Sequence, residues 1–174
     1  MKKRLLACLC FLGSISLSCA AADSSSLAGR WKLDAARSSS LERWAGETMV
    51  ISIQGGNVKI ERHLGMGQGR GVSDTTFVRP DDRTATINPV TYWFDTWFSN
   101  TYIGGDHKKT VRGGWLANGR TLKAETTVVL DGQQGDVPVH IYDEYRLSAD
   151  GRTLRLFELR STRDQALTYV FTRE

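Results

Sequence analysis

Apolar and polar residues alternate with a period of two along most of the chain beyond Leu27. The alternation is clearest in four segments, at residues 49–54, 122–130, 137–147 and 167–171. Because successive side chains of a β-strand point to opposite faces, this pattern predicts strands with one buried face. No segment has the pattern of the crossover helices that a parallel sheet needs. The alternation therefore predicts an all-β, antiparallel fold.

Short turn sequences separate the predicted strands. They pair Gly with Asn or Asp, or place Pro before Asp, at residues 55–57, 80–82, 118–119, 131–132 and 150–151. Asn-Gly and Asp-Gly tolerate the positive φ that tight hairpins need. The spacing predicts roughly eight to ten strands, joined mainly as a meander. Closure into an up-and-down β-barrel is the simplest arrangement, because it removes the exposed edges of the sheet.

The segment 92–99 departs from the period of two. It contains Trp93, Phe94, Trp97 and Phe98, which fall on one side when drawn as a helix. We expect a short amphipathic helix that covers a mouth of the barrel. A fully buried strand is the alternative, since a strand would place aromatic side chains on both faces.

The first 22 residues have the features of a secretory signal peptide. Basic residues at positions 2–4 precede an apolar stretch at 5–17, and three Ala residues at 20–22 supply the small side chains of a cleavage site. The apolar stretch is shorter than the roughly 20 residues that span a membrane. We expect residues 1–22 to be removed and residues 23–26 to form a linker. Residues 27–174 then form the barrel domain.

Export determines the expected location of the protein, which is the periplasm or the exterior. The alternative is an envelope protein that is anchored by a lipid on Cys19. We expect contact with a membrane only if Cys19 is lipidated.

Removal of the leader changes the composition of the chain. The whole sequence has 174 residues, a net charge of +4 and three Cys, but every Cys and three of the basic residues precede residue 23. The remaining chain is nearly neutral and has no Cys. These properties argue against a nucleic-acid-binding protein, a disulfide scaffold and a Cys-ligated zinc site. We expect a monomer.

The first predicted strand of the domain reads Gly29-Arg30-Trp31-Lys32-Leu33-Asp34. It resembles the Gly-x-Trp start of lipocalin-like (calycin) barrels. It is similar in particular to small exported bacterial lipocalin-like domains, which also contain Asp-Gly-x-Thr-Leu hairpins such as residues 150–154. The resemblance implies that Trp31 closes the bottom of the barrel. It also implies that an arginine from a late strand, Arg173 or Arg160, packs over the Trp31 ring.

Several charged residues share the phase of the buried strand faces. They are Arg62, Asp74, Asp143, Glu158 and Arg160. An ionised group inside a barrel is costly unless it is paired or hydrogen-bonded. These residues either line a pocket that holds a polar group of a ligand or pair with one another near the rim. A β-bulge that turns some of them towards solvent is a further alternative.

The favoured function is therefore an extracytoplasmic protein that binds a small, partly apolar molecule inside the barrel. The candidate ligand-binding residues are Arg62, Trp115, Asp143, Tyr145 and Tyr169. The alternative is a non-catalytic envelope or interaction module whose barrel is filled by its own side chains.

Catalysis and metal binding are less favoured by the sequence. His63, His107 and His140 are the only histidines, and the first and last of them have the phase of solvent-facing positions. We find no nucleophile-elbow motif around any Ser and no clear acid–base pair. We therefore expect no metal and no cofactor.

Overall fold

The computed structural model describes residues 24–41, 44–90, 92–93, 102–117, 119–132 and 135–174. The predicted signal peptide at 1–22 lies outside them. In chain order the elements are η1 (Ser24–Leu27), β1 (Gly29–Leu33), η2 (Ala35–Arg37), β2 (Gly46–Gln54), β3 (Asn57–Gly67), β4 (Arg70–Val78), β5 (Thr86–Pro89), β6 (Tyr102–Ile103), β7 (Lys108–Trp115), β8 (Thr121–Gly132), β9 (Gly135–Leu147), β10 (Thr153–Arg160) and β11 (Leu167–Arg173). Both η1 and η2 are short 3-10 helices.

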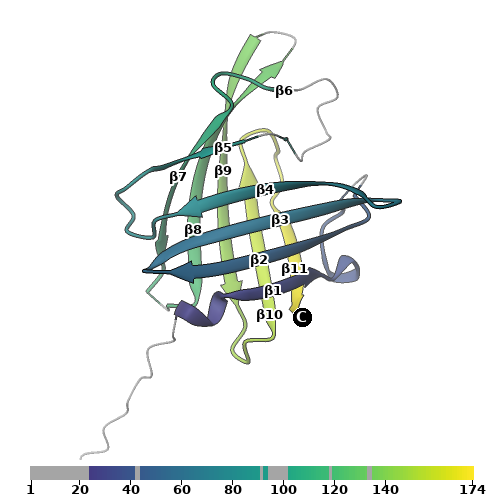
Figure 1. Ribbon diagram of the computed structural model, residues 1–174, viewed down its shortest axis with the longest axis vertical. Coiled ribbons are helices and arrows are strands. Elements are labelled where there is room, and N and C mark those ends of the chain that lie inside the picture. Colours follow the sequence, from purple (N-terminus) through teal and green to yellow (C-terminus); the bar gives the residue numbers. More distant parts are fainter. Residues whose placement is uncertain (1–23, 42–43, 91, 94–101, 118, 133–134) are drawn as a thin grey trace, which may run out of the picture.

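The strands form one antiparallel sheet that curls into a nearly closed barrel (Figure 1). Their order is β4-β3-β2-β1-β11-β10-β9-β8-β7-β5, and the two-residue β6 pairs with β8 outside this path. Strands β1 and β11 pair, which joins the start of the sheet to its end. The predicted all-β, up-and-down barrel is confirmed. The described residues contain 11 strands, slightly more than expected, because β6 is too short to show a pattern in the sequence.

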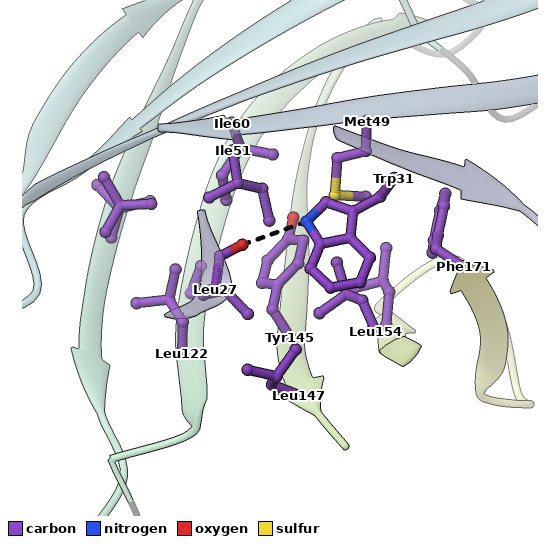
Figure 2. Packing of buried hydrophobic residues seen from close by; sticks show 14 of the residues in the cluster. Leu27, Trp31, Met49, Ile51, Ile60, Leu122, Tyr145, Leu147, Leu154 and Phe171 are labelled. Carbon is purple, nitrogen blue, oxygen red and sulfur yellow. Dashed lines mark hydrogen bonds between the residues drawn. The ribbon is translucent and has the colours of Figure 1, made fainter. Parts of the chain in front are cut away.

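The buried faces follow the alternation that the sequence showed. In Figure 2, side chains of β1–β3 such as Trp31 and Ile60 pack against those of β8–β11 such as Leu122 and Phe171. The exception is Val137, which was expected on a buried face but is 48% exposed. It lies near the tip of the β8–β9 hairpin, which extends beyond the β1–β4 face in Figure 1 and so has no opposing strand to cover it.

The pair implied by the resemblance is present at one end of the barrel. Trp31 is fully buried, and its Nε1 donates a hydrogen bond to the carbonyl oxygen of Leu27 at 3.2 Å (Figure 2). The guanidinium of Arg173 lies 4.2 Å from the centre of the Trp31 ring. Arg173, and not Arg160, therefore takes this position. Gly29 makes the approach feasible, since a Cβ there would collide with the Arg173 guanidinium.

Arg173 also holds the N-terminal segment against this end of the barrel. Its Nη1 donates to the carbonyl of Ala28 at 2.8 Å and its Nη2 to that of Ser26 at 2.6 Å. We expect Arg173→Met to lower the free energy of unfolding by about 1–2 kcal/mol, because the ring contact and these hydrogen bonds are lost. Urea unfolding followed by Trp fluorescence measures the change. The exposed Arg155 on β10 supplies the control Arg155→Met, and an equal effect of both variants contradicts the prediction.

A side chain, and not a strand ladder, closes the barrel between β4 and β5. No ladder joins these strands in the described part of the chain. The fully buried Asn88 of β5 instead accepts a hydrogen bond from the Phe77 N–H at 2.7 Å and donates one to the Phe77 carbonyl at 3.2 Å. A carboxamide offers the same donor and acceptor as a peptide group, so Asn88 replaces a missing strand partner.

We expect Asn88→Ala to lower the free energy of unfolding by about 2–3 kcal/mol. The substitution leaves the Phe77 N–H without its partner, and only the hydrogen bond from the Thr86 hydroxyl to the Phe77 carbonyl at 2.6 Å still links the two strands there. Thermal unfolding and hydrogen exchange at Phe77 measure the effect. The exposed Gln165 supplies the control Gln165→Ala. Unchanged exchange at Phe77 would show that the amide does not close the barrel.

Candidate functional site

The interior of the barrel changes from apolar to charged along several strands. On β9 the inward positions run from Leu147 through Tyr145 to Asp143, and all three are buried. On β10 they run from Leu154 to Glu158, which is paired in register with Asp143. The charged residues at this level come from six strands and are called the interior charged cluster. Its members are Glu47, Arg62, Asp74, Lys109, Asp143, Glu158 and Arg160.

Arg62 is held by carboxylates from two other strands. Its Nε lies 2.5 Å from Oε1 of Glu47 and its Nη2 lies 3.1 Å from Oε2, a two-pronged contact. Its Nη1 lies 3.4 Å from Oε2 of Glu158. Burial lowers the pKa of the Arg62 guanidinium, but the attraction of Glu47 and Glu158 outweighs burial and holds that pKa well above its usual value. The Arg62 side chain therefore stays ionised inside the protein.

Two further cations are paired in the same way. Nη2 of Arg160 lies 2.6 Å from Oε1 of Glu158, an ion pair without hydrogen-bond geometry. The Lys109 ammonium contacts Asp74 and donates to Oγ1 of Thr76 at 2.7 Å. Burial lowers the pKa of Lys109, and the neighbouring Asp74 opposes that change. The contacts of Lys109 join β7 to β4 inside the barrel.

Asp143 differs from the other members of the cluster. Its Oδ1 is buried and has no hydrogen-bond partner among the described residues, and no ion pair there involves its carboxyl group. Burial, followed by repulsion from Glu158, raises its pKa to about 8, although Arg62 acts in the opposite direction. At neutral pH the group is therefore mainly a carboxylic acid, which can both donate and accept a hydrogen bond.

A cavity of about 60 Å³ lies beside this carboxyl group. Charged side chains of the cluster, among them Asp143 and Lys109, line part of it. Val90, Val128 and Ile141, which lie in or against a second buried hydrophobic cluster, line it as well. The volume suits one or two water molecules or a polar group of a few heavy atoms. The site thus combines a polar recognition surface with an apolar one.

Aromatic side chains lie next to the cavity. Tyr92 and Trp93 line it, and Arg160 lies 5.4 Å from the centre of the Trp93 ring. Nε1 of Trp93 is buried without a hydrogen-bond partner among the residues that the structure describes. Tyr92 meets the buried Trp44 edge to face, with ring centres 5.7 Å apart. Residues 94–99 of the predicted helix lie outside the described residues, and Tyr92 and Trp93 are in neither helix nor strand.

The structure brings together three of the five candidate ligand-binding residues. Arg62, Asp143 and Tyr145 all line the cavity. Tyr169 is buried in the main core, where burial raises its pKa to about 12. Trp115 is partly buried and packs against the same core, away from the cavity lining.

The sequence analysis missed Glu47 and Lys109. Glu47 has the phase of Met49 on β2, and Lys109 has the phase of Val111 on β7, so the signal was present in both strands. Both residues stand near the first residue of a strand, where the alternation is too short to be recognised.

The histidines lie outside the barrel. His63 contacts the Ser73 hydroxyl at 2.8 Å, and His140 contacts the Thr127 hydroxyl at 3.1 Å, each across neighbouring strands on the exposed face. Within the described ranges, no group of three or more His, Cys, Asp and Glu side chains is arranged to bind a metal ion. Those ranges also contain no helix with the length and apolar character needed to cross a membrane.

No protein-family model matches this chain, and no curated protein matches it significantly in sequence. The antiparallel, nearly closed barrel is compatible with a calycin-like fold.

Proposed function

We propose that the protein is an extracytoplasmic, lipocalin-like monomer that binds a small, partly apolar molecule at the charged end of its barrel. The main support for this proposal is the carboxyl group of Asp143. It lines the cavity, and its buried oxygen has no hydrogen-bond partner among the described residues. Buried polar atoms of native proteins are nearly always hydrogen-bonded. A ligand group in the cavity supplies the missing bond.

The walls of the cavity support a ligand with two kinds of surface. The lining offers the carboxyl group of Asp143 and the aliphatic side chains of Val90, Val128 and Ile141. Because the cavity measures about 60 Å³, it holds only the polar end of the molecule. The apolar part extends along Tyr92 and Trp93.

The lipocalin-like assignment and export rest on the N-terminal sequence. The stacked pair of Trp31 and Arg173 supports the assignment, since the resemblance implies such a pair. The signal-peptide pattern at residues 1–22 supports export to the periplasm or the exterior.

Binding is tested by titrating the protein with small uncharged alcohols, benzyl alcohol among them, and following Trp fluorescence. We expect a saturable change, because Trp93 lines the cavity. Thr126 is a buried cavity residue, so Thr126→Phe fills the space and abolishes the change, whereas Thr126→Val preserves the volume and retains it. Saturable binding that survives Thr126→Phe contradicts the proposed site.

One observation favours the alternative of a filled barrel. A cavity of about 60 Å³ is well below the roughly 300 Å³ of the smaller ligand pockets in proteins. In that case the charged cluster is structural, and the protein acts as an envelope or interaction module. This alternative predicts no saturable change with any alcohol.

A further inference from the structure

The charges of the interior cluster do not balance when Asp143 is ionised. Among the described residues the cluster contains four carboxyl groups and three cationic side chains. The acids are Glu47, Asp74, Asp143 and Glu158, and the bases are Arg62, Lys109 and Arg160. Ionisation of all of them leaves one uncompensated negative charge inside the barrel, and such a charge is costly to bury.

The uncompensated charge can be assigned to one residue. Glu47 is paired with Arg62, Asp74 with Lys109, and Glu158 with Arg160. Asp143 has no such partner in the described part of the chain, and its carboxyl group borders the cavity. With Asp143 ionised, the cluster therefore lacks one positive charge, and the cavity adjoins the carboxylate that would need it.

We propose that the ligand of this cavity carries a single ammonium group, which forms an ion pair with Asp143 and completes the charge balance of the cluster. This inference rests on the proposed function and specifies the chemistry of its ligand. A primary ammonium on a short carbon chain is small enough for a cavity of about 60 Å³. Its aromatic or alkyl part then extends along Tyr92 and Trp93.

An anionic ligand fits the same cavity poorly. The cations that line it already hold carboxylates: Arg62 contacts Glu47 and Glu158, and Lys109 contacts Asp74. An added carboxylate or phosphate would have to displace one of these acids and leave it buried and unpaired. A neutral alcohol binds without this penalty but leaves the charge of an ionised Asp143 uncompensated.

Three probes that share one benzyl group test the inference: benzylamine, benzyl alcohol and phenylacetate. Isothermal titration calorimetry gives their dissociation constants for the whole protein. We expect benzylamine to bind about tenfold or more tightly than benzyl alcohol above pH 8, because a charge-assisted hydrogen bond is stronger than a neutral one. Phenylacetate binds most weakly.

The variant Asp143→Asn tests the contribution of the ion pair to binding separately from that of the other cavity residues. We expect this variant to lose the preference for benzylamine while it still binds benzyl alcohol. Asp136 is exposed on the same strand, so Asp136→Asn is the matched control and retains the preference. If Asp143→Asn still binds benzylamine more tightly than benzyl alcohol, the inference is overturned.

Binding of benzylamine also depends on pH. Asp143 must release its proton to form the ion pair, so the affinity weakens by up to about tenfold for each pH unit below about 8. The charged groups that face Asp143 from the surrounding strands are Glu158, Arg160, Arg62 and Lys109, Asp74 lines the same cavity, and Tyr145 lies beside it on β9. Burial and nearby carboxylates hold the pKa of Tyr145 well above its usual value, so this tyrosine does not titrate in that range.

The outcomes distinguish the two proposals. Equal affinities for benzylamine and benzyl alcohol at every pH overturn the ammonium ligand but leave the binding site intact. Tighter binding of phenylacetate overturns it as well. If none of the three probes binds, and the alcohol panel also gives no saturable change, both proposals fail.

Discussion

Replacement of Arg62 by Met is expected to lower the free energy of unfolding by about 3–5 kcal/mol, the effect typical of breaking a buried ion pair from one side. The side chain of Glu47 has no exposed surface, and the Arg62 guanidinium pairs with it at 2.5 Å. Loss of the guanidinium leaves a buried carboxylate without compensation. It also removes the 3.4 Å contact to Glu158. Urea unfolding of both proteins gives the difference.

The double variant Glu47→Leu/Arg62→Met is the control for this prediction. It removes both charges and leaves Glu158 paired with Arg160. Replacing a whole buried pair with apolar side chains is often close to neutral. We expect the double variant to be more stable than Arg62→Met alone. If it is as unstable as the sum of the two single variants, the destabilisation comes from packing and not from the charge.

Asp143→Asn is expected to stabilise the folded protein increasingly as the pH rises from about 4 to about 8. The carboxyl group has an ordinary pKa of 3.8, which applies when the chain is unfolded, and a pKa of about 8 in the folded protein. Between these values the unfolded chain releases a proton that the folded protein retains. The stability contributed by protonated Asp143 is thus complete below pH 4 and is lost as the pH rises to about 8.

The expected gain of the Asn variant is about 1.4 kcal/mol for each pH unit in this window, or roughly 5–6 kcal/mol in total. Unfolding free energies of both proteins between pH 4 and pH 9 measure it. Asp136→Asn on the exposed end of β9 is the control and should show no such trend. A difference that is constant across the window would mean that Asp143 is ionised in the folded protein at neutral pH.

The fold could be predicted from the sequence because its main signal is local. Alternation on β8 and β9 follows directly from one strand face meeting the core, and the Asn-Gly and Asp-Gly turns separate the strands. Strand β6 could not be predicted, since a two-residue pair with β8 depends on a contact distant in the sequence. The exposure of Val137 likewise depends on how far the β8–β9 hairpin extends beyond its neighbours.

The candidate site could be predicted only in part, for the same reason. Strand phase placed Arg62 and Asp143 inside the barrel, where both line the cavity. Phase gives no position along the barrel, so it did not distinguish the cavity from the core that holds Tyr169. Strand phase also does not show which charged side chains form ion pairs with one another. Which acid lacks a partner depends on the register of several strands, from the pairing of Glu158 with Asp143 to the contact between Lys109 and Asp74.

The central claim is that the charged end of the barrel is a binding site and not only a structural ion-pair cluster. Native mass spectrometry of the protein, purified from its own source without denaturation, tests this claim most directly. We predict a second species that is heavier by the mass of one small molecule, and that this species is absent from Thr126→Phe, in which the cavity is filled. A single species with the mass of the polypeptide alone, identical in both proteins, would contradict the claim.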